Sequence, residues 1–171
     1  TPRQVTVSSF FMDQTEVSNL DYLEYIYWLT RIYGSDYPEM VTRALPDTLV
    51  WRSSLAYNEP MIEVYFRHPA YRDYPVVGVS WLQANDYALW RSDRVNENLL
   101  IEAGVLTFDQ NQNKDSHFST DAYLAGQYKG VIANGFQDLD PNSETGLRPV
   151  KVEDGILLPK YRLPTEAEWE Y

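Results

Sequence analysis

Oxygen-bearing side chains gather at two places in the chain, and each spacing partly resembles a calcium-binding loop. The first series has Asp109, Asn111, Asn113 and Asp115, and the second has Asp138, Asp140, Asn142 and Glu144. In the first series, Lys114 takes the place of the glycine that a calcium loop needs for its turn, and Thr120 the place of the bidentate glutamate. The second series also lacks the rest of the loop pattern. We therefore favour polar turns for both series and keep a calcium site as the alternative.

The other candidate groups are explained better by structure than by chemistry. His68 and His117 lie far apart, and neither has a neighbour at metal-ligand spacing. Glu166, Glu168 and Glu170 fall in the first turn of a predicted helix, where carboxylates complement the helix dipole and Glu168 completes a cap. No nucleophile elbow or phosphate-binding glycine motif is present. With no cysteine among its 171 residues, the chain holds no thiol nucleophile, thiolate ligand or disulfide.

Composition narrows the class of protein further. The net charge is −11 and there is no run of Lys or Arg, so nucleic acid is not an expected partner. No apolar stretch approaches the roughly 20 residues of a membrane helix. The chain opens with Thr1, Pro2 and Arg3, from which we expect that an upstream segment was removed. Aromatic residues make up 15% of the chain, which suits both a core and a protein interface.

The first half of the sequence predicts one long helix between extended segments. β-Branched and aromatic residues over 5–12 predict a strand, and Ser18 or Asn19 caps a helix that stops near Gly34. Between residues 37 and 73, repeated prolines predict loops with short strands at 48–51 and 62–66.

In the second half, residues 75–79 predict a buried strand, followed by a helix over 80–104. Ser80 and Gln83 form the capping box of that helix. Residues 107–146 are polar but contain aromatic anchors, which indicates a long insertion rather than a free linker. Thr165 opens a last helix, and because a helix that short is unstable alone, we expect the sequence to be cut inside a fold.

Four motifs resemble the formylglycine-generating enzyme (sulfatase-modifying factor) family. They are Phe-Met-Asp with Thr-Glu-Val-Ser-Asn at 11–19, residues 75–81, Tyr-Ala-Leu-Trp at 87–90, and Arg-Leu-Pro-Thr-Glu-Ala-Glu-Trp-Glu-Tyr at 162–171. The resemblance implies an α+β fold, related to C-type lectins and low in regular structure. Residues 1–171 would be the N-terminal part of a single domain, with its insertion at about 107–146. Ala88 stands where the family often has a cysteine.

The resemblance implies no catalytic, cofactor-binding or metal-binding residue within the chain. The copper-binding cysteines and the calcium-ligand region of active family members lie beyond the motif at 162–171. The resemblance therefore leads us to expect a noncatalytic protein. The alternative is a copper-dependent formylglycine-generating oxidase, if cysteines follow further along the sequence. A calcium-dependent glycan-binding module is the second alternative. In such a module the tryptophans would stack on sugars. We favour core packing for Trp81, Trp90 and Trp169, because these three lie in the family motifs.

Four short sequence segments, at 45–51, 65–71, 90–97 and 154–159, resemble the family's lipoproteins of the Bacteroidota gliding-motility and type IX secretion machinery. This resemblance implies a structural or adaptor protein. It would be lipid-anchored in the outer membrane, would face the periplasm and would have other subunits of that machinery as partners.

Overall fold

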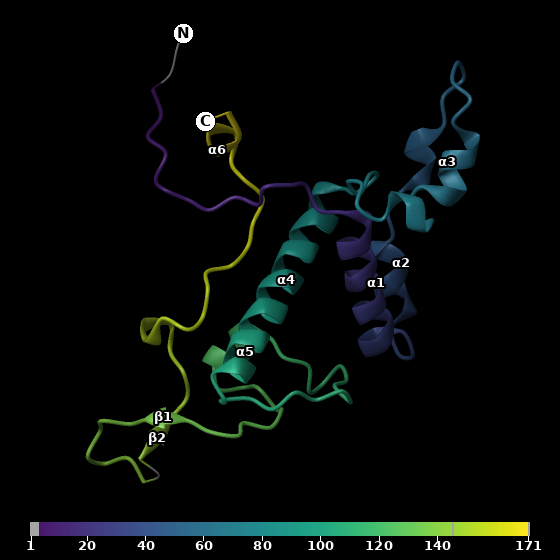
Figure 1. Cartoon of the computed structure of the whole chain (residues 1–171). Coiled ribbons are helices and arrows are strands. Elements are labelled where there is room, and N and C mark those ends of the chain that lie inside the picture. The colour runs from purple at the N-terminus through teal and green to yellow at the C-terminus, as the bar shows by residue number, and fades with distance from the viewer. Residues whose placement is uncertain (1–3, 145, 171) are drawn as a thin grey trace.

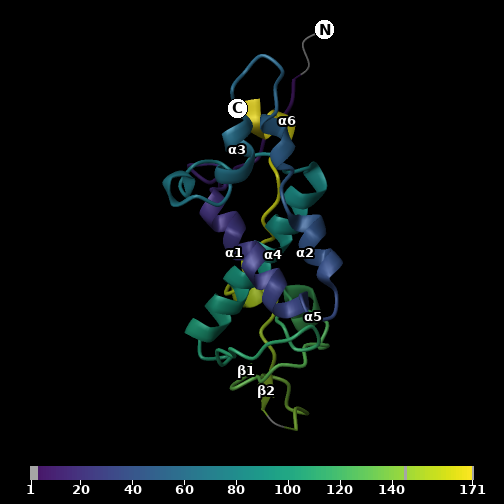
Figure 2. The same ribbon diagram turned by 90° about the vertical axis from the view of Figure 1, so that its right-hand side faces the viewer.

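Two long helices form the body of the protein in this computed structural model, which describes residues 4–144 and 146–170. α1 (Asn19–Tyr33) and α4 (Trp81–Glu102) lie side by side, and α2 (Pro38–Ala44) packs against α1 (Figures 1 and 2). The shorter elements are the 3₁₀ helices η1 (Thr48–Trp51), η2 (Pro69–Tyr71) and η3 (Val152–Asp154), the helices α3 (Glu59–Val64), α5 (Thr120–Leu124) and α6 (Glu166–Glu170), and the strands β1 (Phe136–Gln137) and β2 (Leu147–Arg148).

Both long helices begin where capping chemistry predicts. The Ser18 hydroxyl accepts a hydrogen bond from the backbone N–H of Asp21, whose carboxylate accepts one from the backbone N–H of Ser18. Ser80 and Gln83 make the same reciprocal pair at the start of α4. These bonds satisfy backbone donors that a helix start leaves unpaired, so the helix boundaries predicted from sequence are confirmed there.

Most of the predicted strands are wrong. Residues 5–12 form no strand, 48–51 form η1, and most of 62–66 belongs to α3 and its end. Within 75–79, only an isolated bridge between Pro75 and Ser18 has strand pairing. Proline explains part of the difference, because a proline in the first turn favours helical backbone angles, and the first turns of α3 and η2 each contain one. The described residues offer the segment 5–12 no neighbouring strand.

The named strands pair at the far border of the predicted insertion. β1 and β2 are antiparallel, with Phe136 opposite Arg148 and Gln137 opposite Leu147. They lie at the opposite end of the molecule from α3 (Figures 1 and 2). Helices with a few short strands are consistent with the predicted α+β class.

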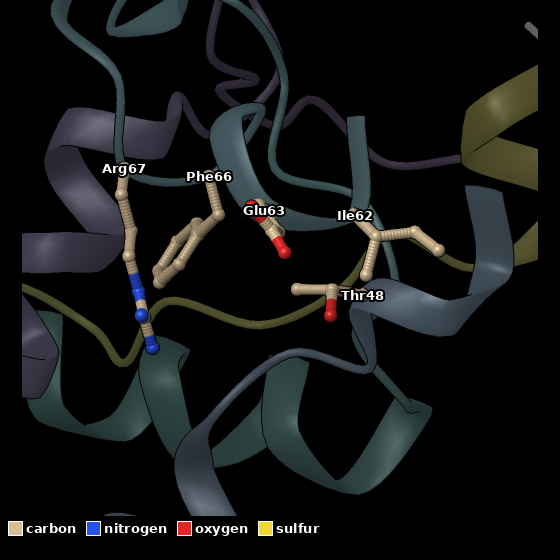
Figure 3. Close-up of a pocket in the computed structure, with 5 residues that line it drawn as sticks. All are labelled: Thr48, Ile62, Glu63, Phe66 and Arg67. Atoms are coloured by element: carbon tan, nitrogen blue, oxygen red, sulfur yellow. The ribbon is translucent and has the colours of Figure 1, made fainter. Parts of the chain in front are cut away.

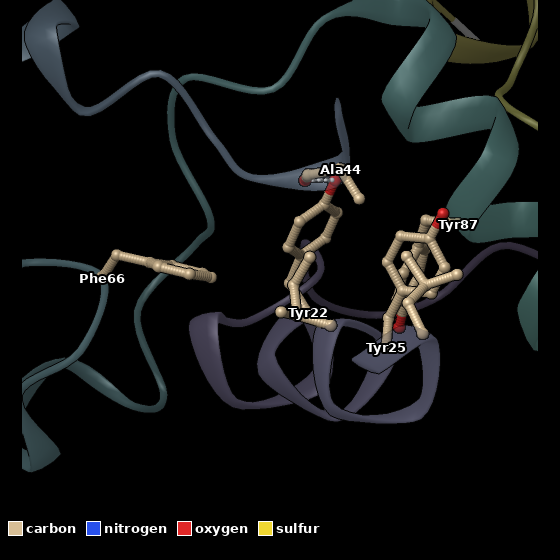
Figure 4. Close-up of a cluster of buried hydrophobic side chains, with 7 residues drawn as sticks. Tyr22, Tyr25, Ala44, Phe66 and Tyr87 are labelled. Carbon is tan, nitrogen blue, oxygen red and sulfur yellow. Dashed lines mark hydrogen bonds between the residues drawn. The ribbon is translucent and has the colours of Figure 1, made fainter. Parts of the chain in front are cut away.

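The first core is aromatic and lies between α1, α2 and α4 (Figure 4). The rings of Tyr22 and Tyr87 stack with centroids 5.6 Å apart, and Tyr25 meets Tyr87 edge to face. The Tyr22 hydroxyl donates to the backbone oxygen of Ala44 at 2.9 Å, so this ring is buried without an unpaired polar atom. Phe66 reaches the same cluster from the segment after α3.

A second core forms within and beside the predicted insertion. Phe118 and Leu100 are fully buried, and Tyr123 and Val150 are nearly so. The backbone N–H of Val150 donates to the Tyr123 hydroxyl at 3.1 Å. Residues 107–146 are therefore polar in composition but contribute buried side chains to this second core.

A buried polar stripe on α4 holds the segment that leads to α6. Asn96 accepts a hydrogen bond from the backbone N–H of Leu158 and donates to the backbone oxygen of the same residue. One turn earlier, the Ser92 hydroxyl accepts from the backbone N–H of Tyr161 at 2.8 Å. Extended backbone is satisfied here by side chains instead of by a sheet. In the part of the chain described, no helix is long and apolar enough to cross a membrane.

Candidate functional site

The two oxygen-rich series form local turns. Asp109 accepts a hydrogen bond from the backbone N–H of Asn111, and Asn113 accepts one from that of Asp115. In the second series, the Asp138 and Asp140 carboxylates accept from the backbone two positions on. These are Asx turns, in which the side chain bonds its own backbone. Among residues 4–144 and 146–170, no group of three or more His, Cys, Asp or Glu is arranged to hold a metal ion.

The two histidines have separate local roles. His68 accepts from the backbone N–H of Ala70 at 3.2 Å and caps η2. His117 packs edge to face between Trp28 and Tyr33, and its Nδ1 lies 3.0 Å from the backbone oxygen of Lys114. The structural interpretation of both residues is supported.

Glu168 caps α6. Its carboxylate accepts from the backbone N–H of Thr165 at 2.8 Å and from both terminal nitrogens of Arg162. The Arg162 guanidinium and that backbone N–H lower the pKa of Glu168 to about 2. The capping role predicted from sequence is therefore confirmed, with an ion pair that the sequence pattern alone did not indicate.

Core packing is wrong for two of the three tryptophans in the family motifs. Trp90 is partly buried against the aromatic core, whereas Trp81 and Trp169 are 73% and 68% exposed. Trp81 is the first residue of α4 and Trp169 lies on α6, which buries no residue. A helix start and a helix standing apart from the body leave these rings without neighbours to cover them.

The feature that sequence reasoning missed is a projecting arm, which we define as residues 48–64. It contains η1, the loop 52–58 and α3, and neither η1 nor α3 buries a residue. Figure 1 shows it standing at one end of the molecule. Leu55 and Tyr57, on the loop, are 98% and 94% exposed, and Leu49 and Val50 of η1 are also exposed. The sequence signal was the group of apolar residues among prolines, which we interpreted as strands.

The arm is braced rather than loose. The Arg52 guanidinium makes two hydrogen bonds with the Glu59 carboxylate, at 2.9 and 3.2 Å, across the base of the loop. Trp51 and Tyr65 pack with ring centroids 4.7 Å apart. The Asp47 side chain caps η1 by accepting from the backbone N–H of Leu49. The loop that displays Leu55 is therefore held in place from both sides.

Hydrogen bonds from the residues on either side of the arm join it to the body. Asn19, the first residue of α1, is 1% exposed and donates to the backbone oxygens of Tyr65 and Tyr71. The backbone N–H of Asp47 donates to the oxygen of Gly78 at 2.8 Å. Gly78 has a φ of +81°, and a Cβ there would lie 2.1 Å from the Asp47 oxygen, so only glycine allows this approach.

A hollow of about 450 Å³ lies beside the arm (Figure 3). Its lining comes from η1, α3 and the residues just after α3, namely Thr48, Ile62, Glu63, Phe66 and Arg67. In Figure 3, Thr48 and Ile62 face Arg67 across the hollow, with Phe66 and Glu63 between them. Phe66 is also a member of the aromatic core, so the hollow opens directly above that core.

A second hollow, of about 320 Å³, lies between residues 13–17 and α4. An ion pair between Asp13 and Arg91 spans it, and the Arg91 guanidinium also lies 4.3 Å from the ring centre of Tyr161. Arg91 therefore joins the N-terminal segment to the segment that leads to α6, and its guanidinium already has partners on both sides.

Comparison with known proteins places the chain in a family. The description "Sulfatase-modifying factor enzyme 1-like domain" matches residues 1–171. No curated protein and no solved structure matches the chain. The matched range includes the body, the arm and the second core alike. The chain therefore belongs to the sulfatase-modifying factor enzyme 1-like family.

Proposed function

We propose that this protein is a noncatalytic structural or adaptor subunit of the Bacteroidota gliding-motility and type IX secretion machinery, which binds other protein subunits through its arm. The observation that carries the proposal is the braced arm, which exposes Leu55 and Tyr57 while no residue of η1 or α3 is fully buried. Large apolar side chains on a rigid projection are typical of binding surfaces. Within the family, the likeness to the gliding-motility lipoprotein GldJ, and secondly to GldK, supports the same role.

The location of that likeness adds support. Of the segments that resemble the lipoproteins, 45–51 leads into the arm and includes η1, and 65–71 directly follows the arm, whereas 90–97 and 154–159 lie outside it. The proposal includes the location that the likeness implies, which is a lipid anchor in the outer membrane and a periplasm-facing domain.

A double substitution tests the proposal in the native host. Leu55→Asp with Tyr57→Asp places two charges on the arm and removes no buried contact. We expect gliding and type IX secretion to fail while the abundance of the protein is unchanged. Leu139→Asp, at a residue 86% exposed and remote from the arm in sequence, is the matched control. Normal gliding and secretion by the double variant would refute the proposal.

The noncatalytic part needs its own assay. The full-length protein is incubated with copper, oxygen and a cysteine-containing sulfatase peptide, and the peptide mass is followed. We expect no conversion of cysteine to formylglycine. Conversion that depends on copper would establish the oxidase instead.

A further inference from the structure

The hollow beside the arm has the chemistry of a socket for a peptide segment. Its floor, which we define as Phe66 and Ile62, is apolar, whereas Thr48, Glu63 and Arg67 make the rest of the lining polar. A volume of about 450 Å³ lies within the range of roughly 300–1,000 Å³ that binding pockets occupy. The floor is continuous with the aromatic core through Phe66, whose ring centre is 6.2 Å from that of Tyr22. An apolar floor favours contact with one apolar side chain.

Two opposite charges border that floor. Glu63 and Arg67 are four positions apart and exposed, and among the described residues neither side chain has a hydrogen-bond or ion-pair partner. Figure 3 shows Arg67 along one side of the hollow and Glu63 nearer its middle, without an ion pair between them. In contrast, Arg52 and Glu59 of the same arm are paired with each other. The rim of the hollow therefore keeps one donor group and one acceptor group available.

We infer that the hollow binds an extended segment of a protein partner in which an apolar side chain lies between an acidic and a basic side chain. The apolar side chain fills the space above Phe66 and Ile62. The partner's carboxylate pairs with Arg67, whose planar guanidinium suits a two-point contact, and its basic side chain pairs with Glu63. This inference rests on the proposed function, because it names the chemistry of the partner that the arm region meets.

Photo-crosslinking in the native host tests the inference with the full-length protein. A benzophenone amino acid replaces Ile62 in the hollow, Tyr57 on the arm loop, or Leu139 as the control. We expect crosslinks from positions 57 and 62 and none from 139. Mass spectrometry of the peptide crosslinked at 62 should find an apolar residue flanked by opposite charges.

A charge exchange tests the rim without changing the net charge. Glu63→Arg with Arg67→Glu should lower the crosslink yield from position 62 about tenfold, because both pairings become repulsive. Glu39→Arg with Arg43→Glu makes the same exchange on the exposed face of α2 and should leave that yield unchanged.

The crosslinking outcomes distinguish the inferred socket from the proposed binding role of the arm. Crosslinks from position 57 but not from 62 would overturn the socket and leave the arm as a binding surface. Crosslinks from neither position would overturn both. A crosslink from 62 that survives the exchange at 63 and 67, or that captures a segment without opposite charges, would also overturn the inferred chemistry.

Discussion

In the arm and in the predicted insertion, burial is the opposite of what amino-acid composition indicates. Residues 48–64 contain many apolar side chains, yet η1 and α3 bury none of them. Residues 107–146 are mostly polar, yet they supply Phe118 and Tyr123 to a core. A few aromatic anchors are enough to form a core in a polar segment, whereas exposed apolar side chains in the arm stabilise the domain little. Burial, rather than composition, separates the part that stabilises the domain from the arm that we propose as the binding surface.

The largest expected effect comes from emptying the second core. Phe118→Ala removes a fully buried ring and should lower the free energy of unfolding by about 3–5 kcal/mol. Tyr57→Ala removes an aromatic ring that is 94% exposed, and should cost less than about 0.5 kcal/mol. Chemical denaturation of both variants measures the difference. Equal costs would mean that the arm contributes to stability as the core does.

The next effect concerns the first core at high pH. Burial raises the pKa of Tyr25 and Tyr87 to about 12, and also raises that of Tyr22. Because the unfolded tyrosine pKa is about 10, these side chains contribute stability that is complete below pH 10. That stability is lost as the pH rises through about 12. Tyrosinate absorbance reports ionisation and circular dichroism reports helix content, so both are followed as the pH is raised. We expect these rings to ionise only as the helices unfold. Ionisation near pH 10 in an intact fold would contradict this expectation.

The smallest effect tests the bracing of the arm. Arg52→Ala removes an exposed ion pair, so the denaturation midpoint should hardly change. The loop 52–58 loses one of its restraints, and its rate of cleavage by an added protease should rise several-fold. Lys160→Ala, which removes the exposed pair with Asp121 elsewhere, is the control for cleavage of this loop. An unchanged cleavage rate would show that the ion pair does not brace the arm.

Sequence reasoning succeeded where the signal is local. The capping boxes at Ser80 and Thr165 depend on residues three positions apart, so they could be identified without knowing the fold, and for the first long helix the sequence left the cap open between Ser18 and Asn19. A strand needs a partner strand, which can come from any part of the chain, and the segment 5–12 has no partner strand among the described residues. The polar turns at 109–115 and 138–144 were predicted for the same local reason, because Asx turns need only adjacent residues.

The arm could not be predicted, because its exposure is a property of the whole fold. Leu55 lies in a segment predicted as loop, and its exposure follows from the placement of α3 at one end of the molecule. The buried bonds of Asn19 and Asn96 likewise join residues distant in sequence, so no spacing in the sequence indicates them.

Hydrogen exchange of the backbone amides tests the central claim most directly. It compares the free protein with the same protein in the assembly purified from the native host. We predict that amides of residues 48–64 exchange at least about tenfold more slowly in the assembly, while those of the second core are unchanged. Equal exchange of residues 48–64 in both states would contradict the claim that the arm is the binding surface.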